Sequence, residues 1–316
     1  MNIFFNDVKH GLLSKSKNLY SKYFYDILGD SIFQELMHSP EYYLSKCELE
    51  ILQNQSYVIA NTIKDHFKEF DLIELGAGDA SKSSFLLQAL QKTDAEFTYY
   101  PIDISSNAIA SLEKELPKTL PSLKITGLNG EYLDMLKQQT ERSKKSKVVL
   151  FLGSNIGNMT SPDAIIFCEQ VRKLLNPGDL LFIGFDLKKN PSTILAAYND
   201  KEGLTRKFNL NLLKRINKEL EGNFNLNNFY HYPCYDPGTG DCKSYLISGK
   251  DQEVKFGQGK DKLTVQFREN ESIFMEISKK YDLTEIESIA VSSGFSVTNH
   301  FFDSKKWFVD SLWKRE

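Results

Sequence analysis

Short apolar runs separated by amphipathic stretches dominate the first two thirds of the chain. The apolar runs predict buried strands at residues 72–75, 96–104, 123–128, 147–152 and 180–185. The amphipathic stretches predict helices at residues 81–90, 107–116 and 163–175, and Pro117 is expected to end the second helix. Strands that alternate with helices at this spacing indicate an α/β fold built on a doubly wound, Rossmann-like parallel sheet.

The pattern changes near residue 190. Helices are predicted at 195–201, 208–220 and 282–293, a β-rich segment at 228–277, and strands at 295–302 and 308–313. Residues 10–50 are helical and rich in aromatic side chains. We therefore expect two domains: a sheet domain of residues 51–190 plus 279–316, and an α+β domain of residues 1–50 plus 191–278.

A glycine loop follows the first predicted strand and precedes a helix, which is the arrangement that holds a cofactor in open α/β sheets. Dinucleotide-binding folds use G-x-G-x-x-G, but here Ser81 stands where the third glycine is expected after Gly76 and Gly78. Asp79 lies inside the turn, where its carboxylate would repel a pyrophosphate. S-adenosylmethionine carries no phosphate, so the loop favours that compound. An ordinary glycine-containing turn remains an alternative.

Composition excludes several functional classes. A formal net charge of −3 argues against a nucleic-acid partner, because such proteins normally carry a basic stripe. No apolar run approaches the roughly 20 residues that a membrane span needs. The N-terminus lacks the basic segment and long apolar core of a signal peptide. We therefore expect a cytoplasmic protein without nucleic-acid or membrane partners.

The cysteines and histidines do not suggest a metal site. The four cysteines contain no C-x-x-C pair, and the five histidines are scattered along the chain. Cys168 lies in an apolar helical pattern and is expected to be a buried thiol.

Polar residues at the predicted strand ends are candidates for ligand binding, since ligands of open α/β sheets lie beyond these ends. Asp103 could accept hydrogen bonds from a ribose diol, or it could cap a helix. Glu131 and Tyr132 could meet an adenine, or they could be a solvated carboxylate beside a core ring. Asn158, in a loop with two glycines, could hold an amino acid's amine and carboxylate, or it could be a turn residue.

A further candidate pair lies in the β-rich segment. If residues 272–278 form a strand, alternation places Glu276 and Ser278 on one face. A carboxylate and a hydroxyl two residues apart could bind a polar heteroaromatic group. The alternative is the polar outer face of an edge strand.

An ordered set of motifs spans nearly the whole chain. The motifs are Phe24-Tyr-Asp-x-x-Gly29, Pro40-Glu-Tyr-Tyr43, Glu74-Leu-Gly-Ala-Gly78 with Lys82, Gly130-Glu-Tyr132, Phe151-Leu-Gly-Ser-Asn-Ile-Gly-Asn158, Ala197-Tyr198, Phe208-Asn209 and Glu276-Ile-Ser278. With them the chain resembles the S-adenosylmethionine-dependent histidine Nα-methyltransferases of ergothioneine biosynthesis and their relatives that act on tryptophan-derived amino acids.

The resemblance implies roles for particular residues. Those implied to contact S-adenosylmethionine are Gly76, Lys82, Asp103, Glu131, Tyr132 and Gly153. Asn158 and Tyr198 would hold the α-amino-acid end of the substrate, and Tyr25 would lie near the amine. Those implied to line the side-chain pocket are Tyr42, Ser244, Glu276 and Ser278. Tyr25 and Asn158 are thus the implied catalytic residues, the first domain binds the cofactor and the second binds the substrate.

The implied reaction moves methyl groups from S-adenosylmethionine to the α-amino nitrogen of L-histidine, three times, to give trimethylhistidine (hercynine), and a monomer is expected. The chain departs from the family's usual pattern at 44–46, at Glu131-Tyr132 and at Ser244, where bacterial histidine enzymes have methionine. The departures at 44–46 and at Ser244 keep open an N-methyltransferase of another aromatic amino acid. A non-catalytic amino-acid or cofactor-binding relative is a further alternative, and an NAD-dependent enzyme is disfavoured by Asp79.

Overall fold

The computed structural model describes residues 3–316, which form two compact units. The large-sheet unit consists of Leu44–Lys188 and Lys279–Glu316. The small-sheet unit consists of the chain up to Tyr43 together with Lys189–Ser278. The first junction lies between Tyr43 and Leu44, at the start of a helix. The sequence suggested a boundary after residue 50, but the helix continues through that position.

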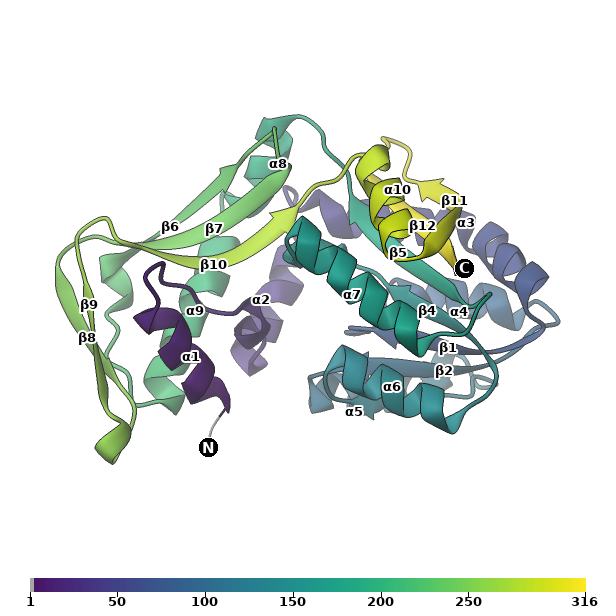
Figure 1. Ribbon diagram of the computed structural model, residues 1–316, viewed down its shortest axis with the longest axis horizontal. Helices are drawn as coiled ribbons and strands as arrows, with labels where there is room; N and C mark the ends of the chain where they lie inside the picture. Colours follow the sequence, from purple (N-terminus) through teal and green to yellow (C-terminus); the bar gives the residue numbers. More distant parts are fainter. Residues whose placement is uncertain (1–2) are drawn as a thin grey trace. The chain divides into compact units, whose positions relative to one another are not determined.

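A seven-stranded mixed sheet forms the centre of the large-sheet unit (Figure 1). Its strands are β1 (Glu69–Leu75), β2 (Glu96–Asp103), β3 (Leu128–Asn129), β4 (Ser146–Phe151), β5 (Leu180–Asp186), β11 (Phe295–Phe302) and β12 (Phe308–Arg315), in the order β11-β12-β5-β4-β1-β2-β3. Strands β1 to β5 pair in parallel, and β12 runs antiparallel to both of its neighbours. The predicted doubly wound α/β class is confirmed, and the two C-terminal strands return to the sheet.

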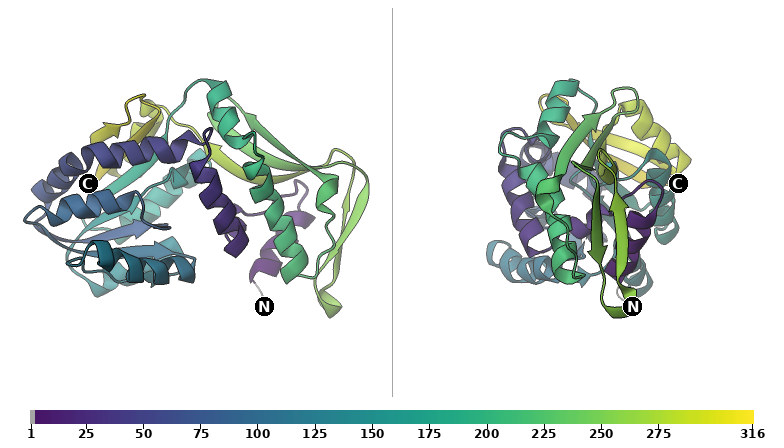
Figure 2. Two further views of the ribbon diagram at one scale, coloured as in Figure 1. Left: turned by 180° about the vertical axis from the view of Figure 1, so that it is seen from behind. Right: turned by 90° about the vertical axis from the view of Figure 1, so that its left-hand side faces the viewer.

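Helices cover both faces of this sheet (Figures 1 and 2). Helices α3 (Tyr43–His66), α4 (Ser83–Gln91) and α5 (Ser106–Thr119) lie on one face. Helices α6 (Tyr132–Arg142), α7 (Ser161–Leu174) and α10 (Leu283–Ser292) lie on the other. This arrangement explains the apolar runs, because parallel strands with helices on both faces bury nearly every side chain.

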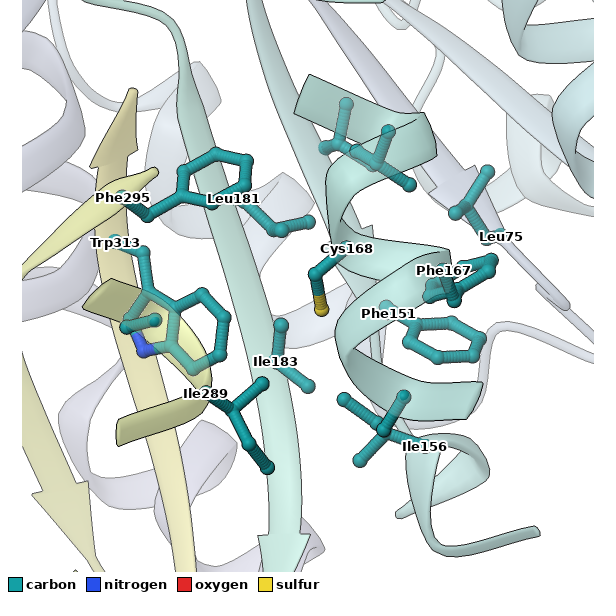
Figure 3. Packing of buried hydrophobic residues seen from close by; sticks show 14 of the residues in the cluster. Leu75, Phe151, Ile156, Phe167, Cys168, Leu181, Ile183, Ile289, Phe295 and Trp313 are labelled. Atoms are coloured by element: carbon teal, nitrogen blue, oxygen red, sulfur yellow. The ribbon is translucent and has the colours of Figure 1, made fainter. Parts of the chain in front are cut away.

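The core beneath α7 and α10 is dense with aromatic side chains (Figure 3). The rings of Phe185 and Trp313 stack with centroids 5.7 Å apart, and Phe295 packs on the same indole at 5.9 Å. Cys168 of α7 points into this cluster, and burial raises the pKa of its thiol to about 12. The predicted buried thiol is confirmed.

The small-sheet unit has two small antiparallel sheets and its own core. Strands β6 (Phe229–Tyr235), β7 (Asp241–Ser248) and β10 (Ser272–Lys279) form one sheet in the order β10-β7-β6, and β8 (Gln252–Phe256) pairs with β9 (Leu263–Phe267). Its helices are α1 (Ile3–Leu13), α2 (Ile27–His38), α8 (Pro191–Tyr198) and α9 (Leu204–Glu219). Helices α1, α2 and α9 lie along one side of the three-stranded sheet (Figures 1 and 2).

Several predicted elements differ in extent from those observed, among them two helices and one strand. Helix α5 passes through Pro117 to Thr119, because a proline in the last turn removes a single backbone donor there. The strand expected at 123–128 is reduced to a bridge at Ile125 and the short β3. Gly127, between them, lies close to Ile109 of α5. Helix α8 begins at residue 191 and ends at 198, because Asn190 caps its first turn and a proline occupies the first position.

Within residues 3–316, no helix combines the length and the apolar character needed to cross a membrane.

Candidate functional site

The loop after β1 is built around close backbone approach at Gly76. Gly76 has a φ of +75°, and a Cβ there would lie 2.7 Å from the hydroxyl oxygen of Tyr132 and 3.2 Å from Nδ2 of Asn155. The N–H groups of Gly76 and Ala77 donate to the carbonyl of Ile102 at 2.8 and 3.2 Å, which ties the loop to the end of β2. Only glycine fits this position.

Asp103 closes β2 and faces the same loop. Its Oδ2 accepts the N–H of Gly78 at 3.1 Å, and its Oδ1 accepts the N–H of Ser105 at 2.8 Å. Each carboxylate oxygen offers about two acceptor positions, so the half-exposed carboxylate can still receive hydrogen bonds from a ligand's hydroxyls.

Glu131 and Tyr132 lie where the chain enters α6. Glu131 is exposed at the N-cap position and makes no capping hydrogen bond with its side chain. The ring of Tyr132 packs edge-on against Phe151 with centroids 5.8 Å apart. Burial, followed by the negative charges of Asp103 and Glu131, raises the pKa of Tyr132. Its phenol therefore stays protonated and can donate a hydrogen bond.

A second glycine loop follows β4. Gly153 and Ser154 have φ angles of +77° and +55°, and the turn continues into a short 3-10 helix, Asn155–Asn158. Two hydrogen bonds fix the turn. Ser154 Oγ accepts the N–H of Asp186 at 3.2 Å, and the Tyr281 hydroxyl donates to the carbonyl of Ile156 at 3.1 Å. Asn158 is exposed at the end of the turn.

Sequence reasoning missed Asn155 in this loop. Its Nδ2 lies 3.6 Å from the position that a Cβ would take at Gly153, as well as close to Gly76. The half-buried amide therefore stands between the two glycine loops. The signal was an amide three residues before Asn158 in the same glycine-containing turn.

Lys82 forms an ion pair with Glu48, a second residue that sequence reasoning missed. Its ammonium donates to Glu48, a fully buried residue of α3, and the other oxygen of Glu48 accepts the N–H of Gly153 at 2.6 Å. The available signal was a carboxylate on the apolar stripe of α3, between the buried Leu44 and Leu52.

The charges around this loop are unusual for a surface turn. Burial raises the pKa of Glu74, at the end of β1, to about 7, although Tyr99 donates a hydrogen bond to its carboxylate. Asp79 Oδ1 accepts the N–H of Ser81 at 2.9 Å, just before α4. A pyrophosphate would need that helix N-terminus, and the carboxylate already occupies it. The donors and acceptors fit a nucleoside joined to an amino acid better than a dinucleotide.

The small-sheet unit brings Tyr198 and Ser278 together. Tyr198 ends α8, Ser278 lies near the end of β10, and their side-chain oxygens are 2.6 Å apart with both residues buried. The ring of Tyr42 meets that of Tyr198 edge-on, with centroids 6.4 Å apart. Tyr42, Tyr198 and Ser278 therefore form one polar and aromatic cluster, although they are far apart in the sequence.

Tyr25 belongs to a neighbouring aromatic group. Its ring packs edge-on against Phe33 of α2 and Phe208 of α9, each at 5.5 Å between centroids. Phe33 in turn meets Tyr42 at 6.3 Å. Phe33 of α2 thus contacts both predicted tyrosines, Tyr25 and Tyr42.

Strands β10 and β7 carry the two remaining predicted pocket residues. Exposure alternates along β10 from Ser272 to Ile277, with Glu276 half-buried between the buried Met275 and Ile277, and Ser278 is buried as well. Ser244 is buried on β7, directly opposite Pro233 of β6. A serine there leaves more room than a larger apolar residue would.

No group of three or more potential metal-binding side chains (histidine, cysteine, aspartate or glutamate) occurs within residues 3–316.

Comparison with known proteins bears on both units. Residues 4–315 match the family described as histidine-specific methyltransferase, SAM-dependent. The chain is 30% identical over 275 residues to the histidine N-alpha-methyltransferase of Mycobacterium tuberculosis, covering 87% of this chain and 83% of that protein. It is 29% identical over 298 residues to the enzyme of the same name from Mycolicibacterium smegmatis, covering 94% and 90%.

A fungal relative extends the comparison. The chain is 30% identical over 279 residues to ergothioneine biosynthesis protein 1 of Neurospora crassa, covering 85% of this chain and 30% of that protein. The resemblance stated from the motifs is confirmed, because the family match spans nearly the whole sequence. The chain therefore belongs to the family of histidine-specific, S-adenosylmethionine-dependent methyltransferases.

Proposed function

We propose that this protein transfers methyl groups from S-adenosylmethionine to the α-amino nitrogen of L-histidine, three times in succession, and so forms trimethylhistidine (hercynine). The observation that carries the proposal is the family match over residues 4–315, which includes both units. The name of the Neurospora relative supports a place in ergothioneine biosynthesis.

The large-sheet unit supplies the proposed binding residues for S-adenosylmethionine, which brings a methyl group on a good leaving group. Gly76 and Gly153 allow the ligand to approach the backbone, and Asp103 accepts hydrogen bonds from the ribose. Glu131 and Tyr132 receive the adenine. Lys82 belongs to the first glycine loop, and its ammonium lies close to Gly153 of the second. The acceptor positions left on Asp103 and the protonated state of Tyr132 support these roles.

The proposed amino-acid-binding residues divide into two groups. Asn158, Tyr198 and Tyr25 hold the α-amino-acid end of histidine. Residues that contact its imidazole are Tyr42, Ser244, Glu276 and Ser278. The hydrogen bond between Tyr198 and Ser278 and the ring contact between Tyr42 and Tyr198 support the grouping.

Orientation is the main contribution of these residues to the rate. The leaving group needs no general acid, and the nucleophile is the neutral α-amine. Aligning the nitrogen with the methyl group and sulfur can supply roughly 7–11 kcal/mol of the barrier reduction. Asn158 accepts and donates hydrogen bonds without titrating, so it can orient the amine and the carboxylate of the substrate together.

Product masses test this proposal directly. The purified protein is incubated with L-histidine and S-adenosylmethionine, and the products are read by mass spectrometry over time. We expect species that carry one, two and finally three added methyl groups. Histidine that gains no methyl group, under conditions where S-adenosylhomocysteine binds, would contradict the substrate assignment.

A second candidate is methylation of another aromatic amino acid, favoured by the small buried Ser244 on β7. A panel of free aromatic amino acids in the same assay separates the two candidates, since the preferred substrate shows the higher kcat/KM. A non-catalytic binding protein is tested in parallel by calorimetry, which would show ligand binding without turnover.

We further propose a monomer that acts in the cytoplasm without a nucleic-acid partner. The net charge of −3 supports the last point, because phosphate backbones attract proteins with a basic surface. Light scattering during gel filtration should give a mass near 36.2 kDa.

A further inference from the structure

We propose that Glu48, a buried residue of α3, is a positioning residue for the methyl donor. Its carboxylate joins Lys82, in the first glycine loop, to the backbone of Gly153, in the second. This inference rests on the proposed function, since it concerns the same S-adenosylmethionine site. Glu48 lies outside every motif on which the family resemblance was based.

Two groups donate hydrogen bonds to the Glu48 carboxylate. Oε1 accepts the N–H of Gly153 at 2.6 Å, and Oε2 accepts the ammonium of Lys82. The ammonium lies 3.7 Å from the position of a Cβ at Gly153. The loops after β1 and β4, which are far apart in sequence, are therefore connected through one side chain of α3.

Strand β5 leaves space for this carboxylate. A Cβ at Gly184 would lie only 2.3 Å from Oε1 of Glu48, and it would also approach Phe308 to 3.0 Å. The φ of Gly184 requires no glycine, because it lies outside the left-handed region. Glycine is thus required here for space, and the space is filled by the Glu48 carboxylate.

A third acidic side chain lies close to the contact between Glu48 and Lys82. Asp310, opposite Gly184 on β12, is fully buried, and in the described chain neither of its oxygens has a hydrogen-bond partner. Burial and the charge of Glu48 raise the pKa of Asp310 well above its usual range, which favours the neutral carboxyl. Burial alone would lower the pKa of Lys82, but the charge of Glu48 and its hydrogen bond raise it overall.

We expect this buried ion pair to hold the two glycine loops in their positions. Replacing the charge of Glu48 leaves Lys82 without its counterion, so the loop from Gly76 to Lys82 loses its connection to Gly153. The predicted consequence is weaker binding of the methyl donor and of its product, with little change in the KM for histidine.

Calorimetry with S-adenosylhomocysteine tests the inference on the full-length protein. Glu48→Gln keeps an acceptor for Gly153 and removes the charge. We expect the Kd of the variant for S-adenosylhomocysteine to rise by about tenfold or more, because the loss of a hydrogen bond to a charged group changes an equilibrium constant by about that factor. The matched control is Glu50→Gln on the same helix, where the carboxylate accepts the N–H of Ser304 at 2.9 Å. Its Kd should equal that of the wild type.

A double-mutant cycle shows whether Glu48 acts through Lys82. If it does, Lys82→Gln weakens S-adenosylhomocysteine binding to a similar extent, and the double variant is little weaker than either single variant. If the Kd of Glu48→Gln equals that of the wild type, or if the two effects multiply independently, the inference is wrong. A wild-type protein that does not bind S-adenosylhomocysteine would instead contradict the proposed function.

Amide hydrogen exchange of the wild type provides a measurement that does not depend on a variant folding. The N–H of Gly153 should exchange slowly without ligand, because it donates to a buried carboxylate. Rapid exchange of this amide would also overturn the inference.

Discussion

At the scale of single residues, Gly76 is the most restrictive position in the large-sheet unit's glycine loops. Gly76→Ala should raise the Kd for S-adenosylhomocysteine by about tenfold or more, because the new methyl group would displace the Tyr132 hydroxyl and the Asn155 amide. Calorimetry measures the change.

Gly178→Ala is the matched control for that substitution. Gly178 also has a positive φ, +91°, but a Cβ there meets nothing within 4 Å. The Gly178→Ala substitution should lower the free energy of unfolding by about 1–2 kcal/mol and leave the Kd for S-adenosylhomocysteine unchanged. Equal affinities for the Gly76 variant and the wild type would show that the close approach is not needed for binding.

Glu74 makes stability depend on pH. Its pKa is raised by burial to about 7 in the folded protein, so between roughly pH 4.5 and pH 7 the folded state holds a proton that the unfolded state has lost. The free energy of unfolding therefore falls as pH rises through this range. The contribution of this one group is about 3 kcal/mol.

Urea unfolding of the wild type and of Glu74→Gln, at about pH 5 and about pH 8, tests this dependence. Glutamine can still accept the hydrogen bond from Tyr99 but cannot ionise. The variant should lose less stability than the wild type between the two pH values. Equal losses would mean that Glu74 keeps an ordinary pKa.

At the scale of elements, a buried ion pair connects β5 to the segment that follows β10. Lys280 and Asp186 are both fully buried, with nitrogen and oxygen 2.8 Å apart. Lys280→Met should lower the free energy of unfolding by about 3–5 kcal/mol, because it leaves the Asp186 charge buried without its counterion. Chemical denaturation measures the difference.

The control for this pair is a lysine at the surface of the same region. Lys188 forms ion pairs with Asp282 and Glu285, both at 2.9 Å, but these side chains are partly exposed. Lys188→Met should cost about 1 kcal/mol or less. If Lys280→Met and Lys188→Met lower the free energy of unfolding by similar amounts, burial does not determine the contribution of these ion pairs.

Element boundaries show where local patterns are insufficient. The strands β1, β4 and β5 were predictable because a strand covered on both faces is continuously apolar. The strand at 123–128 was overpredicted, because its apolar residues do not reveal how few of them pair with the neighbouring strand. The start of α8 was available in the sequence, as Asn190-Pro191, but apolar periodicity alone placed it four residues too late.

At the scale of the whole molecule, the two units should respond separately to substitution. Ser278→Ala removes the partner of the Tyr198 hydroxyl in the small-sheet unit. On the proposed function, the KM for histidine should rise several-fold to about tenfold, because a buried polar group loses a hydrogen bond. The Kd for S-adenosylhomocysteine should stay within about twofold of the wild type.

Steady-state kinetics and calorimetry on the same preparation distinguish these effects. Ser272→Ala, at the exposed start of β10, is a matched control that should change neither constant. A Ser278 variant with weakened S-adenosylhomocysteine binding and an unchanged KM would contradict the division of roles.

The sequence by itself determined the α/β class, the family and the glycine loop, because each depends on residue order within short segments. Only the tertiary structure showed that Asn155 flanks both Gly76 and Gly153, and that Glu48 of α3 connects the two loops. Glu48 and Gly153 are 105 residues apart, so no local pattern relates them. The reason is physical: a buried carboxylate is stable only where distant elements supply its counterion, its donor and its space.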